Sequence, residues 1–216
     1  MTRKSLLATP ASLVFALGLM IAIDQDFSTI QRANSADEGS STELKPAVAK
    51  IGVWLLGGKL TLSALIYFRN GDASALRDAQ EIERKLGIPV REFPPLPKSG
   101  PPGLPAALDY FGKGGGTTIA SDIRRKYGND HATLYEIATR LFLMWNLYQL
   151  DPKLTDTLAQ AINAKCISIA LPDRLWRPAL NLVSQRAKYD DVKSAVIKMD
   201  DDMQTYLGEL ARAESR

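Results

Sequence analysis

Residues 51–68 read IGVWLLGGKLTLSALIYF, and the fold of the chain depends on the secondary structure that they adopt. As a membrane helix, this segment would carry Lys59 at its centre, which costs about 2.5–3.5 kcal/mol on insertion scales. As a soluble helix, it would contain two adjacent glycines, each about 1 kcal/mol less favourable than alanine. As a β-hairpin, it would turn at Gly57-Gly58, and apolar residues would alternate with polar ones from Lys59 onward.

The next residues keep both a helical and a mixed fold open. Apolar residues recur at helical spacing before Gly87, which is well placed to end a helix, and the extended stretch IPVREF follows. Strand, helix and strand over 51–93 would make an α/β unit. We favour a helix for 51–68 because the rest of the chain is helical. The predicted fold is therefore mostly α, with an N-terminal membrane helix and a small helical bundle, and the alternative is α+β with a hairpin or βαβ unit at 51–93.

The first 23 residues have the pattern of a membrane segment. Arg3 and Lys4 precede an uncharged run of 18 residues, Leu6–Ile23, which as a helix would be about 27 Å long. The run ends without a cluster of small residues for cleavage, which favours a retained anchor over a signal peptide. Positive charge on the amino side predicts that the C-terminal domain is extracytoplasmic. The alternative is a secreted or periplasmic protein after signal cleavage.

Composition divides the remaining chain into segments. Residues 24–50 form a predicted flexible acidic tether, and residues 51–88 combine the apolar segment with an amphipathic helix. Seven prolines make residues 89–105 an extended linker, either a spacer on the domain surface or a docking site for a proline-binding partner. The predicted helical domain covers residues 106–216.

A glycine-rich stretch at 110–121 reads YFGKGGGTTIAS and raises the question of phosphate binding. In a Walker loop the lysine follows the last glycine, whereas Lys113 precedes the glycines here. We therefore expect a hinge in which Gly112 ends one helix, Gly114–Gly116 turn the chain and a following threonine caps the next helix. A pocket near this loop is the alternative, and its candidate ligand-binding residues are Lys113, Gly115, Gly116, Thr117, Arg124 and Arg125.

Helical periodicity continues to the end of the chain. Residues 129–150 form the most apolar predicted helix, with Thr133 and Glu136 as a possible capping box. Asp151-Pro152 is a typical helix start. In the last helix, residues 192–210 carry apolar residues at heptad-like spacing, namely Val192, Val196, Met199, Met203, Tyr206 and Leu210. This pattern fits packing on the chain's own bundle or, alternatively, a seam for a protein partner or homo-oligomer.

Composition also excludes several kinds of site. With Cys166 and His131 as the only cysteine and histidine, the chain has no intrachain disulfide, thiolate cluster or two-imidazole site. Asp200–Asp202 would point in different directions on a helix, so we expect a solvated face and no metal site. A net charge of +3 does not indicate nucleic-acid binding. The cluster Arg124–Lys126 better suits membrane lipid phosphates or an acidic partner.

These observations do not fix a function, but they rank three hypotheses. The leading one is a non-enzymatic membrane-tethered accessory, assembly or sensor-like helical domain that acts through protein–protein contacts, without a cofactor. The second is a small-ligand or phosphate-binding protein or enzyme with a pocket near Lys113, Arg124 and Arg125. The third is a two-span subunit of a membrane complex, with Lys59 between its helices.

Overall fold

The computed structural model describes residues 44–214, and every regular element in that range is an α-helix. The described range lies in a compact unit that covers residues 43–216. The predicted anchor at 1–23 and most of the predicted tether lie outside the described residues. The helices are α2 (Pro46–Asn70), α3 (Leu76–Lys85), α4 (Leu104–Lys113), α5 (Gly115–Tyr127), α6 (Asn129–Leu147), α7 (Pro152–Ser168), α8 (Asp173–Ser184) and α9 (Tyr189–Glu214).

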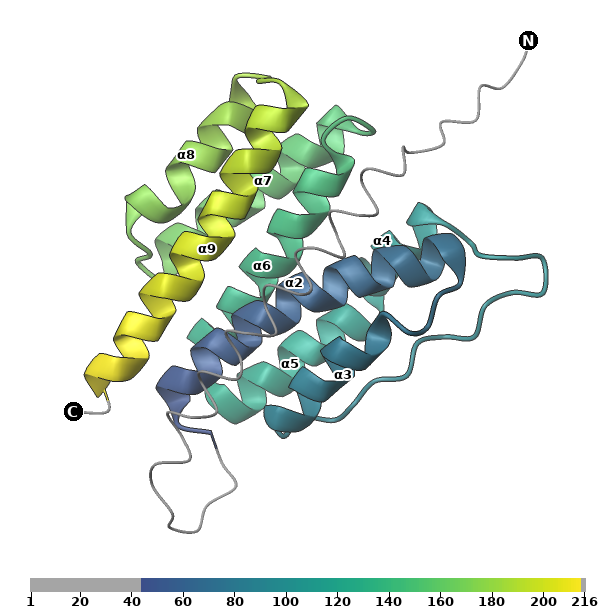
Figure 1. The fold of residues 1–216 in the computed structure, drawn as a ribbon, viewed down its shortest axis with the longest axis horizontal. Coiled ribbons are helices and arrows are strands. Elements are labelled where there is room, and N and C mark those ends of the chain that lie inside the picture. Colours follow the sequence, from purple (N-terminus) through teal and green to yellow (C-terminus); the bar gives the residue numbers. More distant parts are fainter. Residues whose placement is uncertain (1–43, 215–216) are drawn as a thin grey trace. The chain divides into compact units, whose positions relative to one another are not determined.

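Helix α2 is the centre of this fold. It contacts α3, α4, α5, α6 and α9, and Figure 1 shows it running through the middle of the other helices. The predicted helix over 51–68 is confirmed, and the hairpin and βαβ alternatives are wrong. The helix also begins at Pro46, so the end of the predicted tether is helical.

Two glycines in α2 allow it to approach α6 closely. A Cβ atom at Gly57 would lie 2.7 Å from both the Cβ of Ala138 and the backbone oxygen of Tyr135. A Cβ at Gly58 would lie 2.8 Å from the ring of Phe142. The glycines that suggested a turn therefore serve helix packing, and the close contact offsets their low helix propensity.

The burial of α2 is that of a core helix. Among the described helices, α2 alone is long and apolar enough to cross a membrane, and 89% of its most apolar window is buried inside the protein. Lys59 is only 4% exposed, and its Nζ lies 3.4 Å from Oδ2 of Asp78 on α3. The charge that made a membrane span unfavourable thus has an acidic partner on a neighbouring helix.

The proline-rich segment between α3 and α4 lies against the aromatic residues of the helices. Phe93 stacks on Tyr110 with ring centroids 4.4 Å apart and also contacts Tyr67 and Phe68. The hydroxyl of Tyr67 donates a hydrogen bond to the oxygen of Pro94 at 3.0 Å. Residues 89–103 contain neither helix nor strand, as their prolines predict, and these contacts fit the spacer interpretation.

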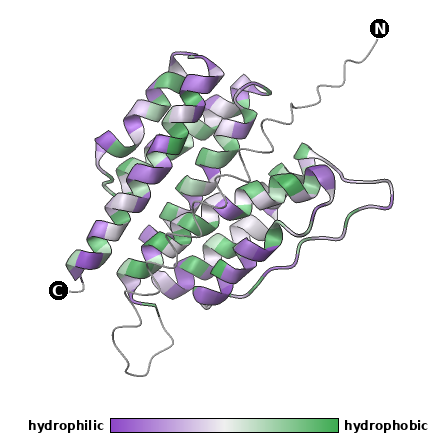
Figure 2. Cartoon of the chain, viewed as in Figure 1, coloured by the Kyte–Doolittle hydropathy of each residue, from purple (hydrophilic) through white to green (hydrophobic). Residues whose placement is uncertain are grey.

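Helix α9 uses its apolar residues inside the bundle. Val192, Val196, Met199 and Met203 are buried, and the helix packs against α2, α6 and α8. Figure 2 shows hydrophilic and hydrophobic residues alternating along α9, as expected for a helix with one buried face. A partner that binds α9 would therefore have to use its outer face, and that contact stays a prediction.

Two of the predicted helix starts can be compared directly with the structure. Oδ1 of Asp151 accepts a hydrogen bond from the backbone N–H of Leu154 at 2.9 Å, which confirms the start of α7. The predicted capping box is wrong, because α6 begins at Asn129 and Thr133 and Glu136 lie inside the helix.

Candidate functional site

The glycine-rich stretch joins two helices, but it differs from the predicted hinge. Helix α4 continues to Lys113 and α5 begins at Gly115, so Gly114 is the one residue between them. The hydroxyl groups of Thr117 and Thr118 donate to the backbone oxygen of Gly114 at 2.7 and 3.4 Å. Neither threonine accepts from a free backbone N–H group, so the predicted threonine cap is wrong.

Glycine is required in this loop by the aromatic residues of α4. A Cβ atom at Gly115 would lie 2.4 Å from the ring of Tyr110, and one at Gly116 would lie 2.8 Å from the ring of Phe111. Both distances are too short for any side chain. The glycines thus let the first turn of α5 pack against the last turns of α4.

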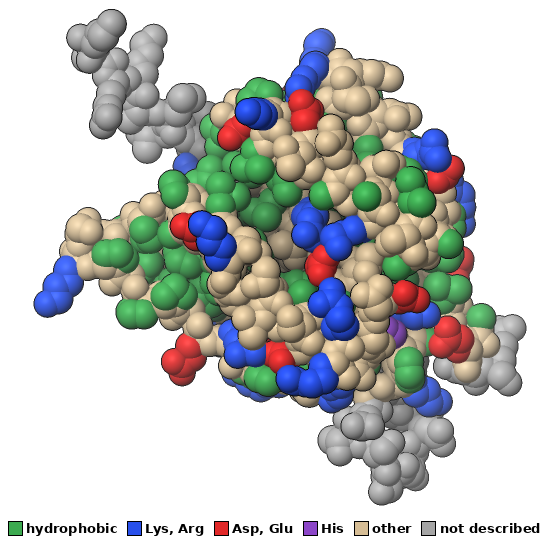
Figure 3. Space-filling model, turned by 180° about the vertical axis from the view of Figure 1, so that it is seen from behind, with side chains coloured by type: hydrophobic (Ala, Val, Ile, Leu, Met, Phe, Trp, Pro, Cys, Tyr) green, Lys and Arg blue, Asp and Glu red, His purple; other side chains and the backbone are tan. Residues whose placement is uncertain are grey.

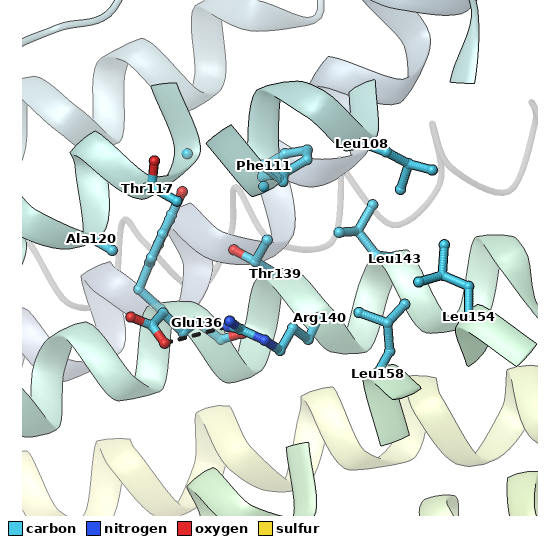
Figure 4. Close-up of a pocket in the computed structure, with 13 residues that line it drawn as sticks. Leu108, Phe111, Thr117, Ala120, Glu136, Thr139, Arg140, Leu143, Leu154 and Leu158 are labelled. Carbon is cyan, nitrogen blue, oxygen red and sulfur yellow. Dashed lines mark hydrogen bonds and ion pairs between the residues drawn. The ribbon is translucent and has the colours of Figure 1, made fainter. Parts of the chain in front are cut away.

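A cavity of about 280 Å³ lies next to this loop, between α4, α5, α6 and α7. Figure 4 shows leucine side chains at one end of the cavity and Thr117, Glu136 and Arg140 at the other. Its full lining consists of Leu108, Phe111, Gly112, Gly116, Thr117, Ala120, Tyr135, Glu136, Thr139, Arg140, Leu143, Leu154 and Leu158.

Two buried hydroxyl groups in the lining have no hydrogen-bond partner among the described residues. Tyr135 is 2% exposed and Thr139 is 6% exposed, one helical turn apart on α6. Burial raises the pKa of Tyr135 well above its ordinary value, and the neighbouring hydroxyl of Thr139 opposes that rise. The two hydroxyls lie close enough to interact with each other, and no other described residue uses their remaining hydrogen-bonding capacity, so they mark a place for a polar group of a guest molecule.

Charged residues surround the polar end of the cavity. The carboxylate of Glu136 accepts from Nη2 of Arg124 at 3.1 Å and from Nη1 of Arg140 at 3.4 Å, and it also pairs with Lys165. Three cations therefore share one carboxylate, which leaves an excess of two positive charges. On the face opposite to that of Figure 1, Figure 3 shows a hydrophobic hollow beside a group of Lys, Arg and acidic side chains.

A second buried polar cluster lies beside the cavity. Glu83 is 1% exposed, and its Oε2 accepts from the backbone N–H of Arg91 at 3.1 Å, whereas its Oε1 has no partner among the described residues. Arg91 pairs with Asp122, and Nε of Arg91 and the hydroxyl of Tyr110 are also buried without a partner there. Burial raises the pKa of Glu83 to about 7, while the backbone N–H and the charge of Arg91 oppose the rise.

The electrostatic influence of Glu83 extends to the cavity. Burial is the largest cause of the raised pKa of Tyr110, and the charge of the Glu83 carboxylate is the second largest. The same carboxylate also raises the pKa of Tyr135. Because Tyr135 lines the cavity, the second cluster and the cavity are neighbours. Glu83 itself is not part of the cavity lining.

Only some of the ligand-binding residues predicted from the sequence lie at the cavity. Gly116 and Thr117 line the cavity, and Arg124 reaches its edge through Glu136. Gly115 packs under Tyr110. Two of the predicted residues point elsewhere: the side chain of Lys113 is 85% exposed and pairs with Asp109 at 3.6 Å, and Arg125 pairs with Asp122 at 2.7 Å. Ligand binding by any of these residues stays a prediction.

The sequence interpretation missed the polar face of α6, although a signal for it was present. Tyr135 and Thr139 are four residues apart, as are Glu136 and Arg140, so the two pairs form adjacent rows along a helix. These rows lie next to the apolar face that was recognised. Glu136 was instead interpreted as part of a capping box, which hid its relation to Arg140.

The two other reactive side chains in the described part of the chain, those of Cys166 and His131, are buried among residues of the fold. Cys166 is buried, and burial raises the pKa of its thiol to about 12, so it is not a thiolate at neutral pH. Nε2 of His131 lies 2.8 Å from the oxygen of Pro46, and burial lowers its pKa. Residues 44–214 contain no group of three or more His, Cys, Asp or Glu residues able to hold a metal ion.

Together the fold and the site define, over residues 44–214, an all-α helical bundle with an apolar cavity that carries polar groups at one end. Comparison with known proteins adds no relative. No protein-family model matches the sequence, and the comparisons found no matching curated protein and no matching solved structure. A functional proposal for this chain therefore has to come from its own residues.

Proposed function

We propose that this chain is a non-enzymatic, sensor-like helical domain that binds a small molecule in the cavity between α4, α5, α6 and α7. In this proposal the segment 1–23 tethers the domain to a membrane, with the domain outside the cytoplasm, and the domain acts through contacts with other proteins. The observation that carries the ligand-binding part is the pair of buried, unpartnered hydroxyl groups of Tyr135 and Thr139 on one cavity.

The size and lining of the cavity support this proposal. Small-molecule sites are typically about 300–1,000 Å³, with mostly apolar walls and a few polar groups that orient the ligand. A cavity of about 280 Å³ lies just below that range, which suits a ligand with one short chain or ring. Binding is favoured over catalysis because, among the described residues, none of the hydroxyl groups of the lining is hydrogen-bonded to a histidine or carboxylate that could activate it as a nucleophile.

Gly112→Leu is expected to block ligand binding without unfolding the protein. Gly112 lines the cavity near the end of α4, and a Cβ atom there would meet nothing within 4 Å. Gly112 is exposed at the edge of the cavity, so a leucine there has room to cover or enter the opening, and it also raises helix propensity. Isothermal titration calorimetry of the full-length protein with a set of eight-carbon probes (octanoate, octan-1-ol, octanamide and octylamine) is expected to detect one-to-one binding of at least one probe, weakened at least tenfold in the variant.

The matched control for this experiment is Gly208→Leu. Gly208 is also helical and has open space at its Cβ position, but it lies on α9 and does not line the cavity. Affinity that falls equally in both variants, or binding of no probe by the wild-type protein, would contradict a ligand site at this cavity.

The proposed membrane tether predicts how the full-length chain fractionates. If residues 1–23 are retained as a helix, the protein should stay with membranes through high-salt and alkaline carbonate washes and should be released by detergent. A variant without residues 1–23 should move to the soluble fraction with its fold intact. Recovery of the full-length protein from the soluble fraction would contradict the tether.

A further inference from the structure

We infer that the ligand of the cavity is an amphipathic organic acid, with an apolar chain among the leucines and a carboxylate group beside Arg140. This inference rests on the proposed function and narrows it to one chemical class. It combines three features of the site: the separation of apolar and polar lining, the excess of positive charge, and the unpartnered hydroxyl groups.

The apolar end of the cavity is suited to a hydrocarbon chain. Its walls are the side chains of Leu108 from α4, Leu143 from α6, and Leu154 and Leu158 from α7, and Phe111 lies between this end and the polar residues (Figure 4). No charged residue contributes to this part of the lining. Each methylene group that leaves water for such an environment gains about 0.8 kcal/mol.

The polar end is suited to an anion rather than a cation. Arg124, Arg140 and Lys165 are neutralised only in part by Glu136, so the electrostatic potential there favours negative charge. Within the described chain, Arg140 makes its hydrogen bonds through Nη1. Its Nε and Nη2 groups remain available, and this edge of a guanidinium matches the two oxygens of a carboxylate.

Two further groups at this end favour a negatively charged acceptor. Tyr135 and Thr139 line the cavity together with Glu136 and Arg140, and the Tyr135 hydroxyl stays protonated at neutral pH because burial raises its pKa. The first turn of α5 supplies Gly116 and Thr117 to the lining, so the positive end of that helix dipole also lies at the cavity. All of these groups stabilise negative charge.

The four eight-carbon probes test this inference because they share a chain and differ in the head group. Octanoate is expected to bind the full-length protein at least tenfold more tightly than octan-1-ol or octanamide, and octylamine is expected to bind weakest. Arg140→Gln should weaken octanoate binding at least tenfold and leave octan-1-ol binding within twofold of wild type. Arg177→Gln is the control, because Arg177 is an exposed arginine on α8 that pairs with Asp173 outside the cavity.

The possible results separate the inference from the proposed function. Equal affinity for octanoate and octan-1-ol, preference for octylamine, or octanoate binding that does not change in Arg140→Gln would overturn the acidic ligand while the binding site stands. Binding of no probe, or binding that Gly112→Leu does not weaken, would overturn both. Loss of octan-1-ol binding together with octanoate binding in Arg140→Gln would show that the arginine only supports the fold, which also overturns the inference.

Discussion

Gly57→Ala is expected to lower the free energy of unfolding by about 2–3 kcal/mol, although alanine in place of glycine within a helix normally stabilises by about 1 kcal/mol. The reason is the contact between α2 and α6. The new methyl group would lie 2.7 Å from the Cβ of Ala138 and 2.7 Å from the backbone oxygen of Tyr135. Neither atom can move without moving helix α6, so the two helices have to separate and lose packing along their length.

Urea denaturation of the full-length protein measures this effect, and Gly208→Ala is the matched control. Gly208 lies within α9, and a Cβ atom there meets nothing within 4 Å. The free energy of unfolding of that variant should therefore rise by up to about 1 kcal/mol. The same substitution should thus stabilise the protein at Gly208 and destabilise it at Gly57.

The outcome also bears on the alternative in which residues 51–68 span a membrane. Gly57 meets α6 only if α2 is packed inside the chain's own bundle, where the structure buries it. If Gly57→Ala were as stable as wild type, the contact between α2 and α6 would be absent. The two-span alternative would then regain support, because a spanning helix would face lipid at some of its positions.

The sequence predicted the helical class but could not place α2 by its pattern. A helix that is buried on all sides has no polar face, so its periodicity cannot distinguish it from a buried strand or a membrane helix. In contrast, α9 keeps a solvated face, and spacing alone identified its buried apolar positions as far as Met203. Beyond that point the prediction is wrong by one residue, because Leu207 and Ala211 are buried in place of the expected Tyr206 and Leu210. The helical structure of α2 and its place in the core depend on the contact of Gly57 and Gly58 with residues about 80 positions later in the chain. A local sequence pattern does not contain that contact.

The site was predictable only in part, for a related reason. Gly116 and Thr117 were singled out because a glycine-rich loop is visible in the sequence, and they do line the cavity. Lys113 was included because it is adjacent in sequence, but its side chain points to Asp109 and solvent. The polar residues of α6 become a site only when α4, α5 and α7 enclose them, and that enclosure is a property of the tertiary fold.

Buried carboxyl groups were also outside the reach of sequence patterns. Asp200 was expected on a solvated face together with Asp201 and Asp202, but it is buried between α9 and α2. Its Oδ1 accepts from Nε1 of Trp54 at 2.7 Å, and its Oδ2 accepts from Nε2 of Gln204 at 3.0 Å. Burial raises its pKa to about 6 against these hydrogen bonds.

The stability of the protein is therefore expected to fall as the pH rises from about 4.5 to about 7. The pKa of Glu83 is about 7 in the native state and near 4.5 when unfolded, and that of Asp200 is about 6 against 3.8. Between these values the native state binds more protons than the unfolded state, so the free energy of unfolding decreases with increasing pH. Each group lowers the free energy of unfolding by an amount on the order of 3 kcal/mol over this range. No further decrease is expected once the pH exceeds the native-state pKa values.

Urea denaturation at pH 5, 6, 7 and 8 measures this slope, and two variants assign it to residues. Glu83→Gln and Asp200→Asn keep an oxygen for the N–H groups of Arg91 and Trp54 but cannot ionise, so each should flatten the curve in its own range and be more stable than wild type at pH 8. Asp202→Asn is the control, because Asp202 is partly exposed and pairs with Lys198 at 3.0 Å. Stability that is constant or rises between pH 5 and 7 would mean that these two carboxyl groups are not buried as the structure places them.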